Sequence, residues 1–190
     1  MGLKRSKLLI LIPCSLALLP ACDNAPPVLT NIETSALSYT EGDPATEIMR
    51  IIFVRDTDDR SLSSARIRIS NNYQSNEDKL AYNGSPPTGI IVYTNNDTLI
   101  LSGSGKLSDY QTALRAITYR NTNTTAPKTS TRTVTFTVSD GNNDSNSVSR
   151  DIIVRNVNDA PILDDTKDGD GRTSAIKLEP VSEDAEAPLE

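Results

Sequence analysis

The chain has 190 residues, with 25 acidic and 19 basic side chains, a formal net charge of −6 at pH 7 and no histidine. This length suits one domain with additional segments at its ends. An acidic chain without a basic patch argues against nucleic acid and against anionic membrane surfaces as partners. Without histidine, Ser/His/Asp and Cys/His catalytic groups are excluded, and we expect a protein that is not an enzyme.

The amino terminus resembles the export signal of a bacterial lipoprotein. Three basic side chains fall within the first seven residues, and the apolar run 8–19 that follows is too short to span a bilayer comfortably. Leu19-Pro20-Ala21-Cys22 then resembles a lipobox, in which Cys22 receives the lipid. We therefore expect residues 1–21 to be removed and the chain to be anchored at the periplasmic or outer cell surface. An ordinary cleaved signal peptide, which would give a secreted protein, and an uncleaved anchor are the alternatives.

Processing at Cys22 would change the charge and the sulfur chemistry of the mature chain. Residues 1–21 carry three positive charges and no acid, so their removal moves the net charge from −6 to −9. Cys14 would leave with the signal peptide, and an acylated Cys22 could not form a disulfide. Stability would then depend on the core and on any metal ion that the chain binds.

The chain after Pro27 shows short segments of alternating apolar and polar residues, rich in Thr, Val, Ile and Tyr, which indicates β-structure. Residues 48–54 form a nearly continuous apolar run and are predicted as a central strand. The predicted strands are 28–32 with 36–39 (one kinked strand), 48–54, 64–70, 80–82, 90–93, 98–101, 118–120, 131–139 and 148–154.

One segment, 107–116, has helical periodicity. Ser108 and Gln111 have the spacing of a capping box, and Tyr110 and Leu114 fall on one face. A series of short strands with turns between them and one short helix predicts an all-β protein, namely a β-sandwich of about seven strands.

Two similar stretches bracket the predicted sandwich. Residues 156–163 follow the last strand, and a weaker copy, 23–29, precedes the first, about 135 residues earlier, as expected for repeat junctions. We assign 22–26 as a linker and 27–160 as the sandwich. Residues 161–190 are assigned as a linker and the truncated start of a second repeat, which we expect to be disordered unless a partner completes it.

Several motifs occur in a fixed order between residues 25 and 163. They are Tyr39-Thr40-Glu41-Gly42, Val54-Arg55-Asp56-Thr57-Asp58-Asp59, Leu107-Ser108-Asp109-Tyr110-Gln111-Thr112-Ala113-Leu114, Ile117-Thr118-Tyr119, Val134-Thr135-Phe136-Thr137-Val138-Ser139-Asp140-Gly141 and Asn158-Asp159-Ala160-Pro161. This series resembles the cadherin-like repeats of bacterial surface adhesins, especially the group related to chondroitin sulfate proteoglycan-type repeats. The resemblance implies a Greek-key sandwich of the cadherin or immunoglobulin type, used in tandem in extracellular or surface proteins, with calcium at the junctions. Such repeats normally form long arrays, whereas this chain holds one repeat and a fragment.

Acidic loops at both ends of such a sandwich could bind calcium. Because loops alternate between the two ends, Asp56, Asp58 and Asp140 would lie near residues 23–24. Glu41, Asn158 and Asp159 would share the far end. Carboxylate and amide oxygens are the ligands that calcium prefers, although Asp-rich loops also simply terminate strands and keep them soluble. The resemblance and this grouping predict calcium at one or both ends. The segment 164–171 superficially resembles an EF-hand loop but places Thr166 and Lys177 where carboxylates are needed.

The sequence favours a calcium-binding structural or adhesion module of a surface lipoprotein. Its expected partners are a neighbouring repeat domain or surface protein, and the membrane through the lipid anchor. A carbohydrate- or matrix-binding module is the alternative, with Tyr73, Tyr82 and Tyr93 as a candidate ligand face. A second alternative is a truncated fragment of a larger repeat adhesin.

Overall fold

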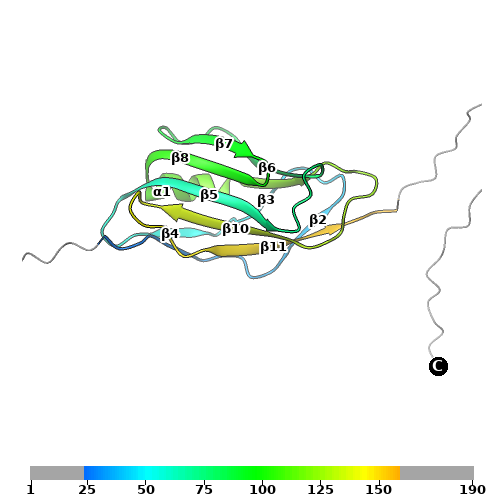
Figure 1. Cartoon of the computed structure of the whole chain (residues 1–190), viewed down its shortest axis with the longest axis horizontal. Coiled ribbons are helices and arrows are strands. Elements are labelled where there is room, and N and C mark those ends of the chain that lie inside the picture. The colour runs from blue at the N-terminus through cyan, green and yellow to red at the C-terminus, as the bar shows by residue number, and fades with distance from the viewer. Residues whose placement is uncertain (1–23, 159–190) are drawn as a thin grey trace, which may run out of the picture. The chain divides into compact units, whose positions relative to one another are not determined.

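A computed structural model describes residues 24–158, which form a β-sandwich (Figure 1). The larger layer is a six-stranded sheet in the order β2-β11-β10-β5-β8-β7. Its neighbours pair antiparallel except β2 and β11, which run parallel. The strands are β2 (Leu37–Thr40), β5 (Ser61–Asn71), β7 (Ile91–Asn95), β8 (Thr98–Lys106), β10 (Arg132–Ser139) and β11 (Val148–Arg155).

The opposite layer is divided. It contains a three-stranded sheet in the order β3-β9-β6, a separate two-stranded pair β1-β4, and the helix α1. These elements are β1 (Val28–Thr30), β3 (Thr46–Glu47), β4 (Phe53–Arg55), β6 (Asp78–Tyr82), β9 (Ile117–Asn121) and α1 (Leu107–Arg115). The all-β class with one short helix is therefore confirmed, with eleven strands among the described residues. No helix in this part of the chain is long and apolar enough to cross a membrane.

The predicted central strand at 48–54 is wrong. Only Phe53–Arg55 forms a strand, β4, and it pairs with β1 alone. Ile48, Met49 and Ile52 are nevertheless fully buried. Ile51 and Phe53 are 52% and 38% exposed, so the run is an irregular segment with only some of its side chains in the core. A short continuous apolar run does not by itself distinguish such a segment from a buried strand.

The predicted capping box is also absent. Lys106 occupies the N-cap position of α1 and has no side-chain capping bond. The Gln111 side chain instead accepts a hydrogen bond from the Val54 backbone N–H at 3.3 Å, which joins the helix to β4. Tyr110, Ala113 and Leu114 form the buried face of the helix.

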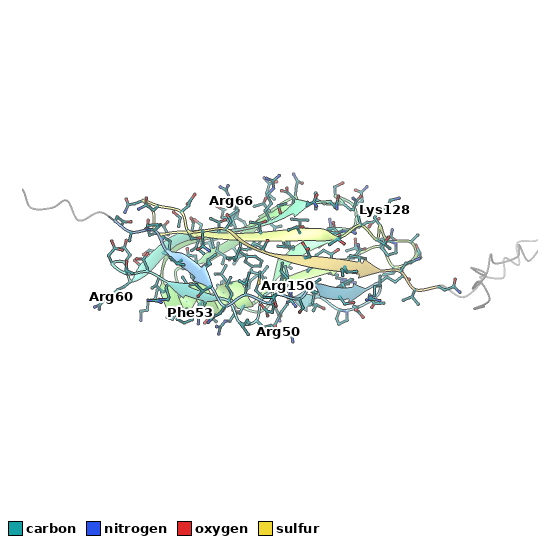
Figure 2. All side chains as sticks on the ribbon, turned by 90° about the horizontal axis from the view of Figure 1, so that it is seen from below. Arg50, Phe53, Arg60, Arg66, Lys128 and Arg150 are labelled. Atoms are coloured by element: carbon teal, nitrogen blue, oxygen red, sulfur yellow. The ribbon has the colours of Figure 1, made fainter. Side chains whose placement is uncertain are left out.

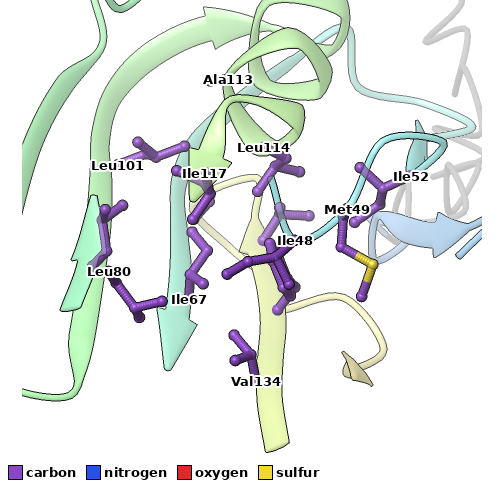
Figure 3. Close-up of a cluster of buried hydrophobic side chains, with 14 of the residues drawn as sticks. Ile48, Met49, Ile52, Ile67, Leu80, Leu101, Ala113, Leu114, Ile117 and Val134 are labelled. Carbon is purple, nitrogen blue, oxygen red and sulfur yellow. The ribbon is translucent and has the colours of Figure 1, made fainter. Parts of the chain in front are cut away.

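The core lies between the two layers. Figure 3 shows side chains from α1, both sheets and the irregular segment meeting in one cluster. Ile67 and Val134 contribute from the six-stranded sheet, Ile48 from the irregular segment, and Leu114 and Ile117 from the helix and β9. These contacts place the loops that follow β4 and β10 at one end of the sandwich.

Burial of Tyr110 predicts a loss of stability in alkali. Its ring is fully buried and its hydroxyl donates to the Gly103 carbonyl at 2.6 Å. Burial raises the pKa of Tyr110 to about 12 from an ordinary 10.0. The unfolded chain releases this proton first, so the stabilisation is complete below pH 10 and is lost as the pH rises toward 12. In urea unfolding between pH 9 and 12, Tyr110→Phe should show a shallower decline than the parent chain. Equal slopes would contradict this account.

Candidate metal centre

Three carboxylates lie together at the end of the sandwich where the described chain begins. They belong to Asp56 and Asp59, in the loop after β4, and to Asp140, directly after β10. One oxygen from each lies within 4.8 Å of the other two, and all three residues are half-buried. Segments more than eighty residues apart thus bring three acids to one point.

Hydrogen bonds within each loop fix the acids. Asp56 Oδ1 accepts the backbone N–H groups of Asp58 and Asp59, at 3.2 and 3.0 Å. Asp140 Oδ1 accepts those of Asn142 and Asn143, at 2.6 and 2.7 Å. Aspartate commonly forms such turns by bonding to the backbone just ahead of it. In each residue the loop occupies Oδ1 and leaves the other carboxylate oxygen for a different partner.

The remaining oxygens of two of these acids have no hydrogen-bond donor. Asp56 Oδ2 and Asp140 Oδ2 are both buried from solvent, and neither has a hydrogen-bond partner in the described part of the chain. A buried charged oxygen that loses water without a replacement costs free energy. A cation placed among the three carboxylates would supply a partner for both atoms.

The amino-terminal segment closes the site. Asn24 donates through Nδ2 to Asp59 Oδ2 at 2.7 Å, and its own Oδ1 and backbone oxygen accept from Asn143 Nδ2 at 2.7 and 2.8 Å. Ala25 N–H donates to Asp58 Oδ2 at 2.9 Å. Although residues 22–26 were assigned as a linker, Asn24 and Ala25 are thus attached to both acidic loops.

Asp58 lies at the predicted end of the sandwich, beside the amino-terminal segment. Its carboxylate holds the Ala25 N–H, which is the main reason that its pKa lies below the ordinary value. Asp56 and Asp140 belong to the three-carboxylate group, whereas Asp58 lies outside it and Asp59 takes the third place. The turn that Asp56 begins does not reveal in the sequence which of the two acids joins it, since the backbone N–H groups of Asp58 and Asp59 both donate to Asp56 Oδ1.

The far end presents a smaller arrangement. With its amide nitrogen facing the acid, Asn156 donates to both Glu41 carboxylate oxygens, at 3.1 and 2.7 Å. Asn158 is exposed at the end of the described chain, while Asp159 and the predicted lipidation site Cys22 lie outside the described residues. Within residues 24–158, a group of three acids suited to a metal occurs only at the end where the described chain begins.

The three tyrosines occupy different environments. Tyr73, after β5, and Tyr82, at the end of β6, are partly buried and pack against the core. Tyr93, on β7, is 49% exposed. The structure thus places Tyr82 and Tyr93 in opposite layers, and leaves Tyr93 as the exposed ring of the three.

Comparison with known proteins gives no relative: no family model matches the chain, and no curated protein or solved structure is significantly similar to it.

Proposed function

We propose that this chain is a calcium-binding, cadherin-like structural or adhesion module of a bacterial surface lipoprotein. The observation that carries the proposal is the group of Asp56, Asp59 and Asp140, with two buried oxygens that lack donors. Calcium bound there would hold the amino-terminal segment and two loops in one arrangement and so stiffen this end of the domain.

Electrostatics favour a cation at this group. Three carboxylates within 4.8 Å of one another repel unless a positive charge lies among them. The ion pairs among the described residues join other acids: Glu33, Glu47, Glu77, Asp78 and Asp97. With no Lys or Arg of residues 24–158 paired to the group, a metal ion is the natural counter-charge.

The ligand chemistry favours calcium over transition metals. Calcium takes six to eight oxygen ligands from carboxylates, carbonyls and water, whereas zinc and copper favour sites with histidine or cysteine, and this chain contains no histidine. Three carboxylates supply part of that number, so water or a neighbouring domain must complete it. We therefore expect an affinity near the weak end of the range, on the order of millimolar, as in other extracellular modules.

The architecture supports use as a module in a series. The described chain begins at one end of the sandwich and β11 leaves at the other (Figure 1). A domain with its two connections at opposite ends can be anchored at one end and followed by a further domain at the other. The lipobox-like sequence before Cys22 would place the acidic group at the anchored end.

Thermal unfolding of the mature chain tests the proposal. The chain begins at residue 22 and carries Cys22→Ser to prevent lipidation. With calcium at about ten times its Kd, binding to the folded state alone should add about 1.4 kcal/mol. This should raise the melting temperature by several degrees. The double substitution Asp56→Asn/Asp140→Asn should abolish the rise, because it removes the two charges whose oxygens lack donors.

Asp151→Asn is the matched control. It likewise removes aspartate charge, but from an exposed position on β11, outside the three-carboxylate group and its loops. The calcium-dependent rise should persist in this variant and be absent when magnesium replaces calcium in the parent chain. No rise in the parent chain, or an undiminished rise in the double variant, would disprove calcium binding at this group.

A further inference from the structure

We propose that β7 is an interface through which two copies of this chain pair edge to edge. β7 is an outer strand of the six-stranded sheet, bonded to β8 on one side (Figure 1). Its residues Ile91-Val92-Tyr93-Thr94-Asn95 include no charge and no proline. Ile91 is 68% exposed and Tyr93 49% exposed.

The other sheet edges carry features that discourage pairing. Natural edge strands avoid association by being very short or by carrying charges, prolines or bulges. β3 has two residues and β1 has three, β4 ends in Arg55, and β6 contains Asp78 and Lys79. β2 has four residues and leads into the turn Glu41-Gly42-Asp43-Pro44. Among the described strands, β7 is the edge that combines five residues with none of these features.

The register of β7 shows which backbone groups are available. A two-residue turn, Asn96-Asp97, joins β7 to β8, with Asn95 opposite Thr98. In such a hairpin, the residues that flank the turn form a hydrogen-bonded pair, and bonded and non-bonded pairs alternate from there. Asn95, Tyr93 and Ile91 therefore direct their backbone groups toward β8. Val92 and Thr94 direct theirs outward, toward the open edge.

This pattern is complementary to itself. When two β7 strands run antiparallel with Tyr93 at the two-fold axis, Val92 lies opposite Thr94 of the second copy. Every outward N–H and C=O of both strands then finds a partner. Tyr93 lies opposite its own equivalent as a non-bonded pair, whose side chains approach closely on one face and whose aromatic rings stabilise the pairing.

Charge at the outer face is compatible with this contact. Arg66 projects from the face of the six-stranded sheet rather than from its edge (Figure 2), and Arg68 is neutralised by Asp97 at 2.7 Å. No like charges would be brought together along the paired strands, since residues 91–95 carry none.

The symmetry has a consequence for function. The strands of the large sheet run along the long dimension of the sandwich (Figure 1), so a two-fold pairing sets the two copies antiparallel. The ends that carry Asp56 and Asp140 would point in opposite directions. Two chains anchored through Cys22 could then pair only across two facing surfaces. This last step rests on the proposed function, whereas the pairing itself does not.

Disulfide trapping tests the register. The probe is the mature chain with Cys22→Ser, which has no other cysteine. With Tyr93→Cys, the two thiols would lie on Cα atoms about 4.5 Å apart. Bridging requires about 4.4 to 6.8 Å. Mild oxidation with oxidised glutathione should therefore produce a covalent dimer.

Ile91→Cys is the matched control, because it is more exposed than Tyr93 but would lie roughly 14 Å from its own equivalent, four residues at about 3.4 Å each. It should cross-link far more slowly. The double variant Ile91→Cys/Asn95→Cys should cross-link again, since residue 91 faces residue 95 of the second copy. Thr94→Pro added to Tyr93→Cys removes an outward N–H and should reduce cross-linking at least tenfold.

Three results would overturn the pairing. They are a monomer at all concentrations in sedimentation velocity, cross-linking of Ile91→Cys at the rate of Tyr93→Cys, and cross-linking that Thr94→Pro leaves unchanged. Circular dichroism melting verifies that each variant is folded. A chelator is added to the trap, so that its outcome does not depend on whether the chain binds calcium.

Discussion

Arg132→Met should destabilise the domain by about 3 to 5 kcal/mol, the cost of removing one partner from a buried ion pair. Arg132 and Asp78 are both fully buried, and Arg132 Nε lies 3.2 Å from each Asp78 oxygen. Without the guanidinium, Asp78 would remain as an uncompensated buried charge. Since a whole domain is stable by about 5 to 15 kcal/mol, urea unfolding should show a much lower midpoint.

The environment of Arg132 explains the expected size of this effect. Its Nη1 donates to the backbone carbonyls of Lys128 and Ser130, and its Nη2 lies 3.4 Å from Glu77 Oε2. Asp78 also accepts the Tyr119 hydroxyl at 2.6 Å. Lys128 lies at the end of the sandwich opposite Arg60 (Figure 2), so this network organises the far end. One arginine thereby fixes a loop and two strands.

Two further variants separate charge from packing. Asp78→Asn combined with Arg132→Met should recover part of the loss, because the buried charge disappears while the amide oxygen can still accept from Tyr119. Arg68→Met is the matched control at the ion pair with Asp97, where the side chains are 59% and 23% exposed. It should cost at most about 1 kcal/mol. An Arg132→Met cost no larger than that of Arg68→Met would contradict the role assigned to the network.

Sequence patterns predicted the fold class because alternation along a strand is local. Val134, Phe136 and Val138 alternate with polar residues and are all buried, as a strand with one face on the core requires. The same alternation carried back to Arg132 also places it inward, yet nothing local identifies its partner. Asp78 lies 54 residues away in sequence, and the pairing depends on how β6 and β10 are brought together.

The candidate metal centre was partly predictable for the same reason. Loops alternate between the two ends of a sandwich, so the loops after β4 and β10 were expected at the same end. This brings Asp56 and Asp140 together. The choice between Asp58 and Asp59 depends on the geometry of a single turn, and the part played by Asn24 depends on side-chain contacts across 35 and 119 residues. Sequence alone specifies neither. Likewise, that β7 is an edge strand follows from the order of the strands in the sheet, which the sequence does not specify.

Gly103→Ala should be the most damaging glycine substitution in the described part of the chain. A Cβ at Gly103 would lie 2.0 Å from the Gly89 carbonyl oxygen, and the residue has φ +126°, a conformation that other residues rarely adopt. Backbone strain of this kind costs about 1 to 3 kcal/mol. Overpacking costs a similar amount, about 1 to 3 kcal/mol. We expect a combined loss of about 2 to 6 kcal/mol in urea unfolding.

Gly84→Ala separates the two contributions. Gly84 also has a positive φ, +95°, but a Cβ there would meet nothing within 4 Å, so this variant should pay the backbone strain alone. Equal losses of unfolding free energy at the two positions would show that the backbone at Gly89 moves aside from the added Cβ at little cost. Because Gly89 lies two residues before β7, displacing it should also shift the edge strand. Gly103→Ala should therefore slow cross-linking through Tyr93→Cys under conditions where the variant is still folded, whereas Gly84→Ala should leave that rate unchanged.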